Sequence, residues 1–483
     1  MARTLATVAR ETHGRLIGAD GGFGAVTTDS RALTAGSLFV AIAGDRFDGN
    51  DFLRDAHEKG AAGALVSRVA DLPLPQVEVR DTRRAFGALA RAWRASFAIP
   101  VVAVTGSSGK TTVKELVASI LGVSRSVCVT QGNLNNDIGV PLTLMRLNED
   151  HDALVAELGA NHAGEIDYLA SLVQPTVGII TNAGTAHLEG FGSIEGIAAA
   201  KGELLDHLPK AGTAVLNADD RFRAEWVARS PCELTVTFGF SERADCTVIG
   251  EPDFDTSGAD FRMRLPDGEE LDVRLPLLGR QNIANALAAA AAAEAVGVSS
   301  DDILTGLGRA TAVRGRLKSL AGRGGATLVD DSYNANPGSV RAALDYLAVL
   351  RGTRILVLGD MAELGPEARA LHRQTGEYAR GRCDALFTIG ELASEAASAY
   401  GAGAQAVPDW QSARAAIEPL LGSATTVLVK ASRVMGLDRL VKALAAEPNG
   451  NGHGNGHGNG NGNGNGNGNG NGNGHVLSNG EAL

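Results

Sequence analysis

Residues 101–112, with the sequence VVAVTGSSGKTT, constrain the fold of this chain more strongly than any other segment. An apolar strand runs into a glycine loop, and a helix is expected to begin near Thr111. In such an arrangement backbone N–H groups converge on phosphate oxygens at a helix N-terminus, which favours the anion. Lys110 can reach the β- and γ-phosphates, and the Thr111 hydroxyl suits Mg²⁺. The segment predicts a nucleotide-binding α/β domain, against the alternative of a Gly/Ser turn followed by a surface lysine.

The length and composition indicate a globular enzyme of several domains. The chain has 483 residues, which corresponds to roughly three domains at about 150 residues each. Hydrophobic residues make up 44% and charged residues 20%, close to the averages of globular proteins. The net charge is −11 and no block of basic residues occurs. A nucleic-acid partner is therefore not expected.

Charged residues near the amino terminus argue against secretion. Arg3, Arg10, Glu11 and Arg15 interrupt the region in which a signal peptide needs an apolar core. The Ala-rich run at residues 286–293 falls well short of the roughly 20 residues that a membrane span requires. The four cysteines have no C-x-x-C spacing and are expected to be reduced. These features predict a cytoplasmic protein.

Strand-like and helical segments alternate through most of the chain and predict an α/β fold of three domains. Residues 1–98 form a small N-terminal α/β domain. Residues 99–311 form a central domain with a mostly parallel sheet and helices on both faces, and residues 312–446 form a Rossmann-like C-terminal α/β domain. The Asn-Gly tail, residues 447–483, has almost no apolar side chains and is expected to be disordered, with no catalytic role.

A carboxylate follows one of the central strands. Glu157 ends the apolar segment Ala153–Glu157, where an open α/β sheet places side chains in its ligand crevice. The alternative is a surface or capping carboxylate. Because a phosphate loop lies nearby in the same sheet, the Mg²⁺ role is favoured.

The loop spacing then narrows the family. A common P-loop needs glycine at position 104, where this chain has Val104, and the shortened form T-G-S-S-G-K-T-T resembles the Mur ligase family. That family includes the peptidoglycan amino-acid ligases and folylpolyglutamate synthase. The resemblance implies that His187 joins a metal site and that Lys201 is carbamylated, so that it supplies oxygen ligands. It thus implies a metal site of Thr111, Glu157, His187 and Lys201, and catalytic roles for Lys110, His187, Lys201 and Arg316.

The resemblance also implies how ATP is held. Asn282 and Asn285 sit three residues apart, hence on one helical face, and are expected to hydrogen-bond adenine; capping of the helix is the alternative. Arg316 is expected to reach the γ-phosphate, and Asp331 either accepts from the ribose or holds the domain hinge. The loop residues expected to bind the nucleotide are Thr105, Gly106, Ser107, Ser108, Gly109, Lys110, Thr111 and Thr112. Gln281, where the family often has His, and Ala431, where it usually has Gly, depart from the family pattern.

Further segments separate the branches of the family. Residues 28–49 resemble the uridine-nucleotide-binding domain of the late Mur ligases, which folylpolyglutamate synthase lacks. The segments 131–141, 158–166, 186–192, 331–337 and 359–365 resemble the branch that joins D-Ala-D-Ala to UDP-N-acetylmuramoyl-tripeptide. Substrate binding is accordingly expected from Ser30, Arg31, Asn133, Asn136, Asn161, Asn334 and Asn336.

The implied reaction is ATP-dependent peptide-bond formation through an acyl phosphate, by a monomer without a membrane span. Three alternatives remain at this point. One is another amide ligase of the family, such as a folylpolyglutamate-type synthase; the second is a P-loop ATPase switch or motor; the third is a non-catalytic scaffold that binds UDP-sugars.

Overall fold

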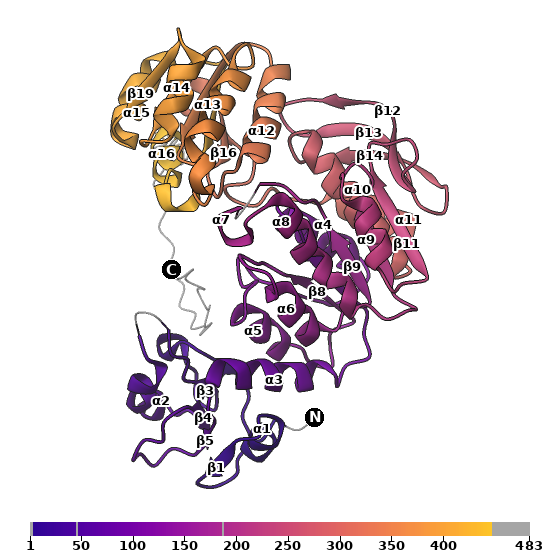
Figure 1. Cartoon of the computed structure of the whole chain (residues 1–483), viewed down its shortest axis with the longest axis vertical. Coiled ribbons are helices and arrows are strands. Elements are labelled where there is room, and N and C mark those ends of the chain that lie inside the picture. Colours follow the sequence, from indigo (N-terminus) through magenta and orange to yellow (C-terminus); the bar gives the residue numbers. More distant parts are fainter. Residues whose placement is uncertain (1–2, 45–46, 186–187, 447–483) are drawn as a thin grey trace, which may run out of the picture. The chain divides into compact units, whose positions relative to one another are not determined.

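The computed structural model describes residues 3–44, 47–185 and 188–446, whose strands form three sheets (Figure 1). The predicted mixed α/β fold class is confirmed. His187 and the predicted tail, residues 447–483, lie outside the described residues. The three sheets fall in turn within the ranges predicted for the three domains, whose boundaries stay a prediction.

The first sheet has five short strands in the order β1-β5-β4-β3-β2. Only β1 pairs antiparallel, with β5. Asp81 caps the longest helix of this part, α3, by accepting hydrogen bonds from the backbone N–H groups of Arg83 and Arg84. The elements are α1 (Leu5–Glu11), β1 (Arg15–Ile17), β2 (Val26–Thr27), β3 (Leu38–Val40), α2 (Leu53–Glu58), β4 (Gly63–Val66), β5 (Gln76–Glu78) and α3 (Thr82–Arg94).

The central sheet has nine strands in the order β14-β13-β12-β11-β10-β9-β6-β8-β7. All neighbours are parallel from β7 to β12, which confirms the mostly parallel sheet. Its strands are β6 (Val101–Thr105), β7 (Val127–Val129), β8 (Ala153–Glu157), β9 (Val177–Ile180), β10 (Thr213–Asn217), β11 (Leu234–Gly239), β12 (Cys246–Phe254), β13 (Ala259–Arg264) and β14 (Glu270–Leu275). Its helices are α4 (Lys110–Leu121), α5 (Gly139–Met145), α6 (Glu165–Val173), α7 (Leu188–Phe191), α8 (Ile194–Gly202), α9 (Arg223–Arg229), α10 (Arg280–Ala295) and α11 (Ser300–Gly308).

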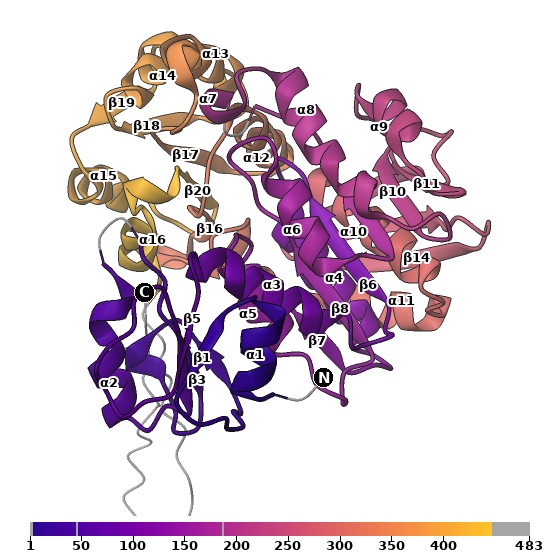
Figure 2. The ribbon, with the colours of Figure 1, turned by 60° about the horizontal axis from the view of Figure 1, so that its bottom comes forward.

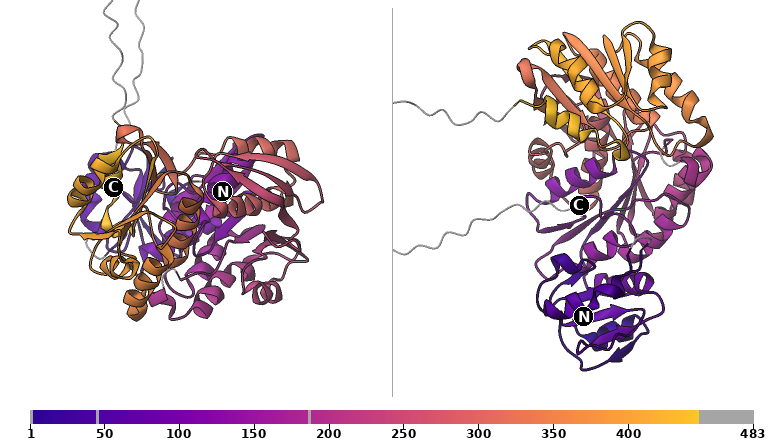
Figure 3. Two further views of the ribbon diagram at one scale, coloured as in Figure 1. Left: turned by 90° about the horizontal axis from the view of Figure 1, so that it is seen from above. Right: turned by 90° about the vertical axis from the view of Figure 1, so that its left-hand side faces the viewer.

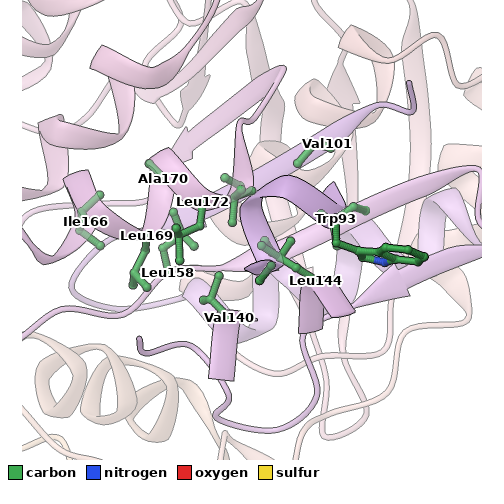
Figure 4. Packing of buried hydrophobic residues seen from close by; sticks show 14 of the residues in the cluster. Trp93, Val101, Val140, Leu144, Leu158, Ile166, Leu169, Ala170 and Leu172 are labelled. Carbon is green, nitrogen blue, oxygen red and sulfur yellow. The ribbon is translucent and has the colours of Figure 1, made fainter. Parts of the chain in front are cut away.

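Helices cover both faces of the central sheet, because its middle strands are apolar on both sides. Val101 and Ala103 of β6 pack into a core with α3, α5 and α6, and Figure 4 shows part of this cluster around Leu144 and Leu169. Val102 and Val104 point to the other face, toward α4 and α10, which lie beside β6 in Figure 2. Period-two alternation in a strand buried on both faces explains this continuous apolar run.

The third sheet has six strands in the order β15-β16-β20-β17-β18-β19, and helices on both of its faces (Figure 3). All of its pairs are parallel except β15 with β16. The elements are β15 (Lys318–Ala321), β16 (Thr327–Asp331), α12 (Pro337–Val349), β17 (Thr353–Gly359), α13 (Ala368–Ala379), β18 (Ala385–Ile389), α14 (Ala393–Tyr400), β19 (Ala404–Val407), α15 (Trp410–Ile417), β20 (Thr425–Lys430) and α16 (Asp438–Leu444).

Within the part of the chain that the structure describes, no helix combines the length and hydropathy that crossing a bilayer would take. The four cysteines are all free thiols, in agreement with the prediction.

Candidate active site

A cavity of about 1140 Å³ opens around the glycine loop and the carboxyl ends of the central strands. It is lined by side chains from all the segments that carried the nucleotide prediction. Of the predicted site residues, those lining it are Ser107, Ser108, Gly109, Lys110, Thr111, Thr112, Asn133, Asn136, Glu157, Asn161, Asn282, Asn285, Arg316, Asp331, Asn334 and Asn336. The sequence segments therefore meet in one place.

The glycine loop needs glycine at two positions, because its backbone has positive φ angles and close neighbours. Gly106 has φ +143°, and a Cβ there would lie 1.9 Å from the Thr181 hydroxyl oxygen. Gly109 has φ +85°, and a Cβ there would lie 2.5 Å from Oδ1 of Asn285. L side chains are strained in such conformations. The loop is thus fixed between β9 and α10.

The segment after β9 holds the loop through hydrogen bonds. Thr181 donates its hydroxyl to the Ser108 carbonyl at 2.6 Å, and Oδ1 of Asn182 accepts from the Ser108 N–H at 3.0 Å. The Ser107 N–H donates to the Asn182 carbonyl at 3.0 Å. Thr181 and Asn182 were not among the predicted site residues, although they directly follow the apolar residues 177–180, which form β9.

Lys110 begins α4 and donates from Nζ to the Gly106 carbonyl at 2.6 Å. Burial lowers the pKa of Lys110; the charge of Glu157 opposes this shift and that of Arg316 adds to it. The three charged groups therefore face one region of the cavity. Such a convergence of two cations and a carboxylate can hold a nucleotide's phosphates together with a metal ion.

Glu157 has one carboxylate oxygen without a hydrogen-bond partner among the described residues. Its side chain is buried at the end of β8, and Oε1 accepts from Nδ2 of Asn135 at 2.9 Å. Oε2 is buried and has no hydrogen-bond partner among residues 3–44, 47–185 and 188–446. A buried carboxylate oxygen of this kind calls for a ligand, and with the nearby Thr111 hydroxyl it fits a hard cation such as Mg²⁺. Asn135, which orients Glu157, was missed at the sequence level although its neighbours Asn133 and Asn136 were named.

Lys201 is buried in α8 and lies behind the cavity, outside its lining. Its Nζ is 3.4 Å from the Ala160 carbonyl and 4.8 Å from the centre of the Phe191 ring. Burial, together with the charge of Lys110, lowers the pKa of Lys201 to about 7. Ala160 itself lines the cavity. His187, the other predicted metal ligand, is outside the described residues, and the described part of the chain contains no group of three His, Cys, Asp or Glu side chains placed to hold a metal.

The two asparagines of α10 share one face, as their spacing predicted. Asn285 donates from Nδ2 to Oδ1 of Asn282 at 2.9 Å, and Asn282 donates to the Leu278 carbonyl at 2.8 Å. Further lining residues of this region, absent from the sequence prediction, are Asn217, Asp219, Phe238, Phe240 and Gln281. Four of these follow or end β10 and β11, so their position at strand ends was the available signal.

The third sheet contributes Arg316, Asp331 and the start of α12. The Arg316 guanidinium lies 4.6 Å from the centre of the Tyr333 ring. Asp331 forms a buried ion pair with Lys430 at 2.5 Å and accepts from the Leu317 N–H at 3.2 Å. Two roles were predicted for Asp331, a hydrogen bond to the ribose and a structural role at the domain hinge. These contacts favour the structural role, because they tie β16 to β20 and to the segment that carries Arg316.

The predicted asparagines also have structural tasks. Asn336 caps α12 by accepting from the Ser339 N–H at 2.8 Å, and it donates from Nδ2 to the Ser108 hydroxyl at 3.2 Å. Asn136 accepts from the Gly139 N–H at 2.8 Å at the start of α5. Both amides therefore line the cavity while some of their hydrogen-bonding groups are already bonded to the protein.

Ser30 and Arg31 lie apart from this cavity, beside the first sheet. Neither belongs to its lining. Arg31 pairs with Asp29 at 2.9 Å, and Ser30 is buried with its carbonyl accepting from Lys59 at 2.6 Å. Their predicted role in substrate binding stays a prediction.

Comparison with known proteins places the whole described chain in one family. Three family models match in succession: "Mur ligase family, catalytic domain" over residues 23–94, "Mur ligase middle domain" over residues 104–293, and "Mur ligase, glutamate ligase domain" over residues 315–433. A UDP-N-acetylmuramoyl-tripeptide--D-alanyl-D-alanine ligase of Escherichia coli (strain K12) is 45% identical over 446 residues, which are 91% of this chain and 98% of the relative.

Solved structures agree. The UDP-N-acetylmuramoylalanyl-D-glutamyl-2,6-diaminopimelate--D-alanyl-D-alanyl ligase of Acinetobacter baumannii has a TM-score of 0.82 at 36% identity, over 92% of this chain and 98% of that one. The MurF ligase of Thermotoga maritima, solved with ADP, has a TM-score of 0.79 at 28% identity, over 86% of this chain and 96% of that one. A folylpolyglutamate synthase of Mycobacterium tuberculosis has a TM-score of 0.61 at 17% identity, over 74% of this chain and 94% of that one. At this identity the comparison shows a shared fold alone. The chain belongs to the Mur ligase family, in its branch of UDP-N-acetylmuramoyl-tripeptide--D-alanyl-D-alanine ligases.

Proposed function

We propose that this chain is an ATP-dependent ligase that joins D-Ala-D-Ala to UDP-N-acetylmuramoyl-tripeptide and so makes the UDP-pentapeptide precursor of peptidoglycan. The observation that carries the proposal is the convergence of the glycine loop, Lys110, Glu157 and Arg316 on one cavity. A switch or motor would need only the nucleotide end of this cavity. Arginine and asparagine side chains extend the lining well beyond it, which supports a second, larger substrate.

The chemistry requires two displacements. The terminal carboxylate of the tripeptide attacks the γ-phosphorus of ATP and ADP leaves, which gives an acyl phosphate. The amine of D-Ala-D-Ala then attacks the acyl carbon, and phosphate leaves from the tetrahedral intermediate. Lys110 and Arg316 offset the negative charge that gathers when a carboxylate approaches a triphosphate, so catalysis rests on positioning and charge neutralisation.

Thr111 and Glu157 are the residues of this chain that would hold Mg²⁺, together with His187 and carbamylated Lys201. When bound, the ion would neutralise phosphate charge and orient the phosphates. The unpartnered Oε2 of Glu157 supports this assignment. The remaining predicted roles are kept as proposals: adenine contacts by Asn282 and Asn285, substrate contacts by the predicted asparagines, a monomeric state and a cytoplasmic location.

Carbamylation of Lys201 is supported by its burial and by its pKa of about 7. A neutral amine attacks CO₂ to form a carbamate and releases one proton, and with this pKa much of the amine is neutral at pH 7.5 to 8. The carbamate would replace this largely neutral buried amine with an anion that the charge of Lys110 attracts.

Removing CO₂ and bicarbonate is expected to lower the turnover of the enzyme reversibly, because the metal site loses one oxygen ligand. Activity is measured in degassed buffer at pH 8 before and after bicarbonate is added, and carbon-13 bicarbonate should give one protein carbamate resonance that Lys201→Arg abolishes. Turnover that is indifferent to bicarbonate, with no such resonance, would contradict carbamylation.

Truncation after Ala446 is expected to leave turnover within about twofold of that of the full chain. The reason is that the tail has almost no apolar side chains that could pack against the rest of the protein. The cut retains the hydrogen bond from the Ala446 N–H to the Ala321 carbonyl at 2.9 Å, which ties the end of the described chain to β15. Steady-state rates and thermal midpoints of both forms test this, and a large loss would assign the tail a role.

The proposed function itself is tested by phosphate release with Mg-ATP, UDP-N-acetylmuramoyl-tripeptide and D-Ala-D-Ala, each omitted in turn. Phosphate and a UDP-pentapeptide, followed by mass, should appear only when all three are present. ATP hydrolysis that ignores both peptide substrates would instead indicate a switch or a different ligase, and folate with glutamate would be tried next.

A further inference from the structure

Arg84 lines the cavity without an ion-pair partner among the described residues, and it lies on α3, outside the segments predicted to bind the nucleotide. The basic residues lining the cavity are Arg83, Arg84, Lys110, Arg316 and Lys430. Lys430 is paired with Asp331 and Arg83 with Asp137, at 2.5 and 3.1 Å. Lys110 and Arg316 also form no ion pair among the described residues, but both are predicted to bind phosphate, and the charge of Arg316 contributes to the lowered pKa of Lys110. Arg84 remains, and within the described chain no carboxylate forms an ion pair with it.

Arg84 lies on a fixed platform. Its guanidinium carbon is 4.3 Å from the centre of the Tyr168 ring, which also lines the cavity. A guanidinium that stacks on a ring face can present N–H groups at its edge, and Arg84 also interacts with the Tyr168 hydroxyl, which opposes the rise in the pKa of Tyr168 caused by burial. Tyr168 in turn packs against α3 so closely that a Cβ at Gly87 would lie 2.1 Å from its hydroxyl oxygen. The position of the ring beneath Arg84 is therefore limited by the contact of the Tyr168 side chain with Gly87 of α3.

The helix that carries Arg84 is also anchored to the central body. Trp93, near the end of α3, donates from its indole N–H to the Leu147 carbonyl at 3.0 Å, and Arg94 donates from Nε to the Val173 carbonyl at 3.0 Å. The apolar side of α3 packs in the cluster that includes Leu144 and Leu172 (Figure 4). Arg84 is thus an exposed side chain on a helix that is itself fixed to the central body, so its backbone needs no reordering when an anion binds.

We propose that Arg84 is a specificity-determining residue that binds a non-reacting carboxylate of the tripeptide. The inference rests on the proposed function. The name of the Acinetobacter baumannii relative spells out alanyl, D-glutamyl and diaminopimelate residues. A peptide of this kind has, besides the carboxylate that reacts, a free carboxylate on the glutamyl residue and one on the diaminopimelate side chain. Either fits the planar fork of an arginine. A lysine in the third position would retain only the glutamyl carboxylate.

The test replaces Arg84 with methionine, which keeps a long apolar stem over Tyr168 and removes the charge. Arg91→Met is the matched control, because Arg91 is exposed on the same helix and does not line the cavity. Arg84→Met should raise the KM for UDP-N-acetylmuramoyl-tripeptide roughly 10- to 100-fold, as loss of a charge-assisted hydrogen bond does. The kcat and the KM values for ATP and D-Ala-D-Ala should stay near those of the control, and Arg84→Lys should recover part of the loss.

Two tripeptide substrates identify the carboxylate. A rise in KM confined to the diaminopimelate peptide assigns Arg84 to the side-chain carboxylate, and an equal rise with the lysine peptide assigns it to the glutamyl carboxylate; both outcomes support the proposal. An unchanged KM for both peptides overturns it. So does an equal weakening of inhibition by UDP-N-acetylmuramic acid, which lacks the peptide, since the contact would then be to the diphosphate. Wild-type product formation separates these outcomes from a failure of the proposed function.

Discussion

Replacing Lys110 with alanine is expected to reduce kcat by at least about 10²-fold, the scale at which enzymes lose a preorganised electrostatic contact. Lys110 is the cation at the head of α4, and its Nζ already points back across the glycine loop to the Gly106 carbonyl. Bound phosphates would offer it a stronger partner. The charge is needed most when the tripeptide carboxylate approaches the γ-phosphate, so the loss should appear in kcat more than in the KM for ATP.

The measurement is the steady-state rate of phosphate release with all three substrates saturating. Lys210→Ala is the control, since Lys210 is exposed and lies outside the cavity. The Lys110 variant should remain folded, because a single hydrogen bond to a carbonyl is worth only about 1 kcal/mol. A kcat close to that of the control would exclude Lys110 from the reaction.

Glu157→Gln is expected to have the second large effect, a loss of kcat of about 10²-fold or more together with a higher Mg²⁺ requirement. Glutamine has the shape of glutamate and can still accept the hydrogen bond from Asn135 at the amide oxygen. What it removes is the negative charge on the buried pair of oxygens, one of which has no partner in the described chain. The substitution therefore isolates the proposed cation-binding role.

Stability separates this role from a structural one. Burying an uncompensated carboxylate costs free energy, so the glutamine variant should unfold at the same or a higher temperature than the wild type in the absence of Mg²⁺ and nucleotide. Rates are measured across a Mg²⁺ titration, with Glu233→Gln as an exposed control. A variant that loses stability along with activity, or whose Mg²⁺ dependence is unchanged, would contradict a metal-binding Glu157.

Some elements of the fold have sequence signals that are weaker than those of the parallel strands. The hairpin β13-β14 alternates buried and exposed residues along both strands, and Asp267-Gly268 is a typical tight-turn pair whose glycine has φ +94°. This half-exposed antiparallel pair lacks the continuous apolar run that marks the buried parallel strands, so it was not predicted. Arg84 and Tyr168 had no such local signal, because an arginine near a helix start and a tyrosine in another helix are unremarkable until α3 and α6 pack together.

The sequence alone determined the local chemistry. The family resemblance, the glycine loop and the two apolar strands each depend on short patterns of neighbouring residues. The structure has the glycine loop before Lys110 and the two strands, β6 and β8, where these patterns predict them. Tertiary structure decided which of these groups share a cavity. It brought the charge of Arg316 within reach of Lys110, left Oε2 of Glu157 without a partner among the described residues, buried Lys201 outside the cavity lining and set Arg84 on the Tyr168 ring. Those outcomes follow from the packing of helices and sheets far apart in the chain, and the resulting burial and charge proximity have no signature in local sequence.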